Sequence, residues 1–189
     1  MTHIYFVRHA EPDFSVHNDE NRPLTEKGLK DAQSVQAFFS CLNVDAFYSS
    51  PYKRAIDTIK GAADLKGTKI TLIDDFRERA VSDEWIDDFN AFARRQWSDF
   101  DFKLPCGESL RETETRNIRS FSEILQKHEG ETVVIGGHGT AISTLLHHYN
   151  PSFGYEDFKS IQPIMPFVVL FTFQKDRCLG YRFVPTEKA

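Results

Sequence analysis

Short apolar runs alternate with longer amphipathic segments along this chain, and this alternation constrains its fold more than any other feature. The runs are rich in β-branched and aromatic residues and predict four strands, over residues 3–7, 44–48, 69–73 and 132–135. Strands that alternate with helices favour a mainly parallel sheet with helices on both faces. The sequence therefore predicts an α/β protein, a three-layer α/β/α sandwich. Its 189 residues suffice for a single domain, residues 1–189, with a sizeable core.

The helical segments begin at residues that are typical of helix N-termini. Thr25 is expected to cap a helix that runs to about Cys41, and Ser50 to cap the next one, with Pro51 at its first position. Further helices are expected over 84–97, 108–129 and 140–149. The last two apolar runs, 166–173 and 178–183, predict a hairpin that forms an antiparallel C-terminal edge of the sheet.

Composition excludes several classes of partner. The net charge is −5 and no basic stripe is present, which argues against nucleic-acid binding. No apolar run approaches the roughly 20 residues of a membrane helix, and we expect no signal peptide and no membrane partner. The three cysteines, Cys41, Cys106 and Cys178, are odd in number and widely spaced, which favours a reducing, cytoplasmic location.

Polar side chains that could take part in binding or catalysis follow each predicted strand. The first strand ends in Arg8 and His9, the second leads to Ser49–Arg54, the third to Glu78 and the fourth to His138. Ligands of open α/β sheets bind at the carboxyl ends of the strands, so these side chains are expected to share one pocket. Guanidinium forks match phosphate oxygens, a neutral histidine can attack phosphorus, and a carboxylic acid can protonate the leaving oxygen. The set therefore predicts phosphoryl transfer.

The same residues carry a family resemblance. Arg8–Glu11 resembles the R-H-G/A-E/Q signature of the histidine phosphatase superfamily, which includes the cofactor-dependent phosphoglycerate mutases. Arg22–Gly28 is similar to the P-L-T-x-x-G segment of that family, Ser49–Ala55 to its S-S-P-x-x-R-A segment, and Gly137–Gly139 to its second-histidine motif. The motifs occur in the family's order and span nearly the whole chain.

The resemblance implies the same three-layer fold and assigns roles to individual residues. It implies that His9 forms a phosphohistidine, and that Arg8, Arg54 and His138 hold the phosphoryl group. We expect no cofactor and no metal, because the sequence shows no cluster with metal-ligand spacing. Phe89 and Phe92, with Trp85, share one helix face, and we expect this aromatic segment to contribute both core and pocket wall.

Four residues are candidates for the acid and for further contacts with the substrate. The family's acid lies in a segment like L-R-E-x-x-x-G-x-W-E-G, whose register favours Glu78 and leaves Glu84 as the alternative, because the glycine is missing here. Ser15 stands six residues after His9, where the family often has Asn, and is a candidate substrate contact. His17, in the same loop, is a candidate for the mouth of the pocket.

The sequence thus predicts a metal-independent phosphatase for a phosphomonoester. One alternative is a phosphoglycerate mutase-like phosphotransferase, although 189 residues leave little room for the insertions that enclose the site in those relatives. Another is a phospho-ligand binding module without catalysis, which would need the arginines but no nucleophile such as His9. The expected partner is a small phosphorylated metabolite. Phosphoprotein side chains as substrates and the oligomeric state stay open.

Overall fold

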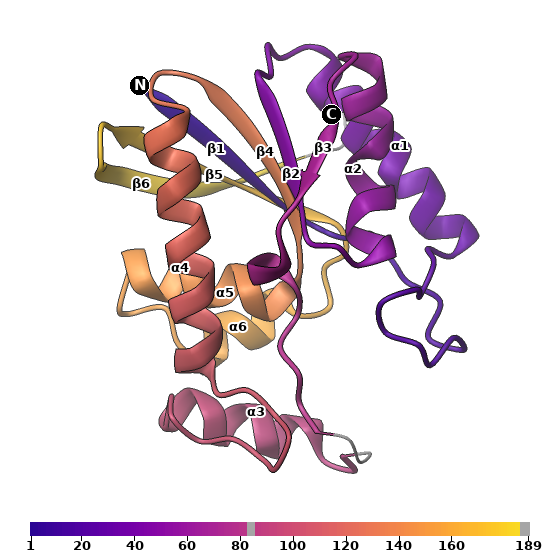
Figure 1. The fold of residues 1–189 in the computed structure, drawn as a ribbon. Helices are drawn as coiled ribbons and strands as arrows, with labels where there is room; N and C mark the ends of the chain where they lie inside the picture. Colours follow the sequence, from indigo (N-terminus) through magenta and orange to yellow (C-terminus); the bar gives the residue numbers. More distant parts are fainter. Residues whose placement is uncertain (83–85, 186–189) are drawn as a thin grey trace.

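The computed structural model describes residues 1–82 and 86–185, and within them six strands form one sheet (Figure 1). The strands are β1 (Thr2–Arg8), β2 (Ala46–Ser49), β3 (Ile70–Leu72), β4 (Thr132–Gly137), β5 (Phe167–Gln174) and β6 (Arg177–Val184). Their order is β3-β2-β4-β1-β5-β6. The first four run parallel, and β5 and β6 add an antiparallel edge. The expected mainly parallel sheet with an antiparallel C-terminal edge is confirmed.

Helices cover both faces of this sheet, as expected. On one face lie α1 (Glu26–Ser40) and α2 (Lys53–Leu65), and on the other α4 (Leu110–Lys127) and α5 (Gly139–Tyr149) (Figure 1). Two further helices, α3 (Phe89–Ser98) and α6 (Tyr155–Ile161), lie below the sheet in this view. The short 3₁₀ helix η1 (Asp74–Phe76) and α6 were not predicted. No helix in the described ranges has the length and apolarity to cross a membrane.

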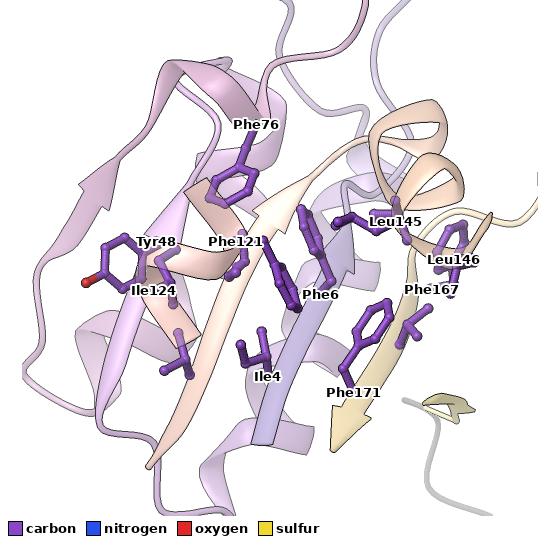
Figure 2. Close-up of a cluster of buried hydrophobic side chains, with 14 of the residues drawn as sticks. Ile4, Phe6, Tyr48, Phe76, Phe121, Ile124, Leu145, Leu146, Phe167 and Phe171 are labelled. Atoms are coloured by element: carbon purple, nitrogen blue, oxygen red, sulfur yellow. The ribbon is translucent and has the colours of Figure 1, made fainter. Parts of the chain in front are cut away.

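Strand β1 shows why both faces of the sheet are apolar. Its alternate residues Ile4 and Phe6 enter the cluster under α4 and α5, and Tyr5 and Val7 enter the cluster under α1 and α2. Figure 2 shows the first cluster, in which Phe6 lies close to Phe121, 6.5 Å between ring centroids. A strand buried on both sides reads as a continuous apolar run rather than an alternating one. The core therefore packs against β1 on both faces and fixes the position of its carboxyl end.

One predicted helix start is confirmed and another is wrong. Thr25 caps α1, because its hydroxyl accepts a hydrogen bond from the backbone N–H of Gly28. Helix α2 begins later than expected, at Lys53, and its N-cap residue Tyr52 makes no side-chain cap. The hydroxyl of Ser50 is instead directed to His138, 2.8 Å from its Nε2 atom. Ser50 therefore contacts the second histidine at the edge of the sheet and is not the N-cap residue of α2.

The helix expected over 84–97 is also shorter than expected at its N-terminal side. It begins at Phe89, where the side chain of Asp88 accepts a hydrogen bond from the backbone N–H of Ala91. An aspartate at this position satisfies a donor that the helix itself leaves unpaired, which fixes the start. Residues 86–88 are not helical. Trp85 and Glu84 lie outside the described residues.

Candidate active site

The register of the parallel strands brings the motifs together. Arg8 in β1 lies opposite Gly137 in β4, so the histidines that follow these two strands start from neighbouring positions. The backbone N–H of His9 donates to the carbonyl of Gly137 at 3.0 Å, and that of Ser50 donates to the carbonyl of Gly136 at 2.9 Å. The carboxyl ends of β1, β4 and β2 therefore form one continuous edge. Open α/β sheets bind their ligands at such an edge.

A cavity of about 780 Å³ opens at this edge. Five of the predicted site residues line it, namely Arg8, His9, His17, Arg54 and Glu78. Further lining residues come from the loop after β1 (Phe14, Asp19 and Arg22), the start of α2 (Tyr52), the loop after η1 (Arg79 and Val81), α3 (Phe89), α5 (Thr140) and the α6 region (Phe158 and Met165). Neither Ser15 nor the fully buried His138 is in the lining.

His9 is buried and held in one orientation. Its Nδ1 atom lies 2.8 Å from the carbonyl oxygen of Ala10. A carbonyl can only accept, so Nδ1 carries the proton and Nε2 keeps its lone pair. Burial, followed by the positive charge of Arg54, lowers the pKa of His9 to about 3. The imidazole is therefore neutral at physiological pH and can act as a nucleophile.

Arg8 is fixed from one side only. Its Nη1 atom donates to the carbonyls of Ile161, Gln162 and Ile164, at 3.1, 2.6 and 2.8 Å. Its buried Nε atom has no hydrogen-bond partner within the described part of the chain. Burial lowers the pKa of Arg8 to about 10, so the side chain stays charged at neutral pH. The guanidinium is thus a preorganised cation with a donor to spare, as the binding of an anion requires.

Arg54 connects the site to the loop after β1. Its guanidinium donates to the backbone carbonyl of Asp19 and forms an ion pair with the Asp19 carboxylate at 3.2 Å. It also lies over the ring of Tyr52, 5.0 Å from the centroid. Asp19 makes a second ion pair with Arg22, at 2.7 Å. The loop is therefore fastened at the cavity by charged contacts.

His138 lies beside His9 in the interior. The two ring centroids are 5.3 Å apart and the rings meet edge to face. His138 is fully buried, and its Nε2 atom is 2.8 Å from the hydroxyl of Ser50. Burial, and then the positive charge of Arg54, hold its pKa well below the ordinary value. Its Nδ1 atom has no partner among residues 1–82 and 86–185.

Glu78 reaches the same edge from the loop after η1. One carboxylate oxygen accepts from the backbone N–H of Arg79 at 2.9 Å, and the other from the N–H of Thr140 at 3.1 Å. Thr140 is in the first turn of α5, so this contact holds Glu78 at the N-terminus of that helix. Of the two candidate acids, Glu78 thus lies at the cavity, whereas Glu84 falls outside the described residues. The choice of Glu78 as the acid stays a prediction.

Two residues that sequence reasoning missed hold the Glu78 loop in place. The carboxylate of Glu108 accepts from Arg77 at 2.7 Å, from Arg116 at 2.9 Å, and from the N–H of Ala80 at 3.1 Å. Arg116 also donates to the carbonyl of Arg77 at 2.9 Å. Burial opposes the ionisation of Glu108, but its contacts with Arg116 prevail and lower its pKa. The loop is therefore clamped on both sides of Glu78.

A Glu108→Gln variant is expected to unfold about 2 kcal/mol more easily than the wild type, because it leaves a largely buried arginine without its carboxylate. Urea denaturation monitored by circular dichroism measures this change. The matched control is Glu123→Gln, at an exposed position in α4, for which we expect a change within about 0.5 kcal/mol. Equal stability of the two variants would show that the clamp is not energetically significant.

Arg79 is a third residue that the sequence did not reveal, and it lines the cavity. It is buried, donates to Gln96 at 2.9 Å and to the hydroxyl of Thr140 at 3.3 Å, and lies over the rings of Phe89 and Phe92. Phe89 lines the cavity and Phe92 is buried in the interior. The aromatic segment therefore supplies both pocket wall and core. No local signal distinguishes Arg79 from the other charges between Asp74 and Arg79.

Comparison with known proteins agrees with this geometry. The family model described as histidine phosphatase superfamily (branch 1) matches residues 4–179, which is nearly the whole chain. The chain therefore belongs to the histidine phosphatase superfamily. This confirms the resemblance that the four sequence motifs indicated.

Individual relatives carry names from both branches of activity that the sequence left open. A 2,3-bisphosphoglycerate-dependent phosphoglycerate mutase 2 of Gloeobacter violaceus is 28% identical over 166 residues, 77% of this chain and 74% of that protein. A putative phosphoserine phosphatase 2 of Hydrogenobacter thermophilus is 26% identical over 158 residues, 77% of each chain. The fold is shared with a phosphoserine phosphatase variant of Entamoeba histolytica solved with phosphoserine, with a TM-score of 0.76, 20% identity and 96% of both chains covered.

Proposed function

We propose that this protein is a phosphatase that hydrolyses a phosphomonoester through a phosphohistidine on His9. The observation that carries the proposal is the state of His9 itself. It is neutral, its Nδ1–H is engaged by the Ala10 carbonyl, and it lines the cavity beside Arg8 and Arg54. A binding module needs cations around a phosphate but has no use for an imidazole held with Nε2 free to attack.

The first step transfers the phosphoryl group to the protein. The Nε2 lone pair of His9 forms a bond to phosphorus while the bond from phosphorus to the ester oxygen breaks. Glu78, protonated for this step, gives its proton to the departing oxygen, and a neutral alcohol leaves. Arg8, Arg54 and His138 hold the oxygens of the phosphoryl group, whose charge is spread most widely in the transition state.

The second step returns the protein to its starting state. Glu78, now a carboxylate, removes a proton from a water molecule as the water oxygen attacks phosphorus. The bond between phosphorus and Nε2 breaks, its electron pair returns to His9, and inorganic phosphate leaves. Every group recovers its initial protonation, so no co-reactant other than water is consumed.

We further propose that the reaction needs no metal ion and takes place in the cytoplasm. In support of the first point, the described ranges contain no group of three His, Cys, Asp or Glu side chains that could hold a metal. In support of the second, the three cysteines form no framework for disulfides in the sequence. The substrate is a small phosphorylated metabolite. The putative phosphoserine phosphatase 2 of Hydrogenobacter thermophilus, a relative of this chain, is named for one such compound.

The test measures phosphate release from an aryl phosphate and from a panel of phosphorylated metabolites, with and without 3-phosphoglycerate. We expect phosphate release without any added acceptor, and unchanged rates after dialysis against a chelator. Transfer of the phosphoryl group to the acceptor without net release would identify a mutase-like phosphotransferase. Saturable binding without turnover of any ester would identify a binding module. A rate restored by added divalent metal would overturn the metal-independent mechanism.

A further inference from the structure

The hydroxyl of Ser50 occupies a position that helix capping does not explain. Ser50 is fully buried at the end of β2, and its Oγ lies 2.8 Å from His138 Nε2. The same oxygen accepts a hydrogen bond from the backbone N–H of Tyr52 at 3.2 Å. Ser50 thus connects the start of α2 to the second histidine of the site.

The protons of this small network can be counted. A serine hydroxyl has one hydrogen and two acceptor sites, and one acceptor site is taken by the N–H of Tyr52. A donation from Ser50 to His138 Nε2 uses the hydroxyl hydrogen and satisfies both atoms of this contact, and the donor left over is then the Nδ1–H of His138. If Nε2 donated instead, the hydroxyl hydrogen would have no acceptor among the contacts of Ser50 in the described structure. Leaving a buried donor unpaired costs free energy.

The charge around His138 limits it to one ring proton. The burial of the ring, and then the positive charge of Arg54, favour the neutral imidazole, whose pKa is held well below its usual value. A neutral imidazole carries its proton on one nitrogen only. With Nε2 accepting from Ser50, that proton must be on Nδ1, the atom without a partner in the described structure.

We propose that Ser50 is a positioning residue that fixes His138 in its Nδ1–H tautomer, so that the ring offers a donor and not a lone pair to the transferring phosphoryl group. This proposal rests on the proposed function, which places a phosphoryl group beside His9 and His138. Phosphoryl oxygens are acceptors only, and a lone pair directed at them would be repulsive. The hydroxyl of Ser50 therefore decides whether His138 attracts the phosphoryl oxygens with an N–H or repels them with a lone pair.

The tautomer can be read directly. Protein labelled with ¹⁵N in its histidine rings is studied by long-range nitrogen–proton NMR, with a His138→Asn spectrum to assign the His138 signals. We expect Nδ1 of His138 to be the protonated nitrogen in the wild type. In Ser50→Ala we expect the proton to move wholly or partly to Nε2. The matched control is Ser49→Ala, which removes a hydroxyl that is equally buried and has no partner among the described residues.

Kinetics give a second readout. Ser50→Ala should lower kcat about tenfold or more, because the site loses part of a preorganised donor to the phosphoryl group. The loss should be equal for aryl and alkyl phosphates, since His138 acts on the phosphoryl group and not on the leaving oxygen. Ser49→Ala should stay within about twofold of the wild type, because the removed hydroxyl makes no contact with the site.

The outcomes separate this proposal from the proposed function. A wild-type His138 protonated on Nε2, or a tautomer unchanged in Ser50→Ala, would overturn the role of Ser50 whatever the activity. Equal kcat values for Ser50→Ala and Ser49→Ala would also overturn it. If the wild type released phosphate from no ester, the proposed function would fail, while the NMR result would still decide the tautomer.

Discussion

A His9→Ala variant should lose phosphatase activity by about four orders of magnitude or more, because it removes the neutral imidazole that lines the cavity beside Arg8 and Arg54. The measurement is phosphate release from an aryl phosphate. In the wild type, turnover with ³²P-labelled substrate, quenched without acid, should leave an acid-labile and base-stable label on His9. Label on a serine or cysteine, or wild-type activity in His9→Ala, would contradict the mechanism.

The pH dependence of the free energy of unfolding shows whether His9→Ala is folded and tests the low pKa of His9. In the wild type the folded state binds a proton at His9 only near pH 3, whereas the unfolded chain binds one near the ordinary histidine pKa of 6.5. As the pH falls through this window, the unfolded state takes up more protons, and the folded protein loses stability. His9→Ala lacks this linkage and should lose less stability between pH 6 and about 4. Urea denaturation at both pH values gives the comparison.

A Glu78→Gln variant should discriminate sharply between substrates. An alkyl phosphate has a poor leaving oxygen that needs a proton, so its hydrolysis should fall by about 10²–10⁴-fold. An aryl phosphate with an acidic phenol needs little protonation, and its first step should fall far less. The measurement is kcat/KM for both esters, which reports the steps up to phosphoryl transfer.

Glu84→Gln is the matched comparison, because Glu84 is the other acid that the family register allows. We expect it to affect both esters alike and only slightly. If the dependence on the leaving group appears in Glu84→Gln and not in Glu78→Gln, the acid assignment is wrong. Loss of both activities to the same extent in Glu78→Gln would instead point to a role in holding the loop between Arg77 and Ala80.

Much of this protein was accessible from local sequence patterns. The capping of α1 by Thr25, the bounds of β1 and the C-terminal hairpin follow from neighbouring residues, because backbone preference and side-chain periodicity act over a few positions. The motifs around His9 and His138 were likewise visible as strand ends. These features predicted the fold class and four residues that line the cavity, Arg8, His9, Arg54 and Glu78.

The role of Ser50 could not be predicted from its own segment. Serine before proline is typical of a helix start, and the sequence offered nothing against that interpretation. Only the pairing of β2 with β4 places its hydroxyl beside His138, a residue 88 positions away. Contacts of this kind depend on which strands become neighbours, and strand order is not encoded in any local pattern.

The supports of the site were hidden for the same reason. Arg8 is held by carbonyls near Ile161, more than 150 residues away, and the loop around Glu78 is clamped by Glu108 and Arg116. In the sequence Glu108 and Arg116 look like ordinary charged residues of a solvated helix. The sequence by itself thus determined the secondary elements and the chemical groups of the site, because these follow from local preferences. The tertiary structure alone decided their partners, burial and protonation, because these depend on distant segments that folding brings together.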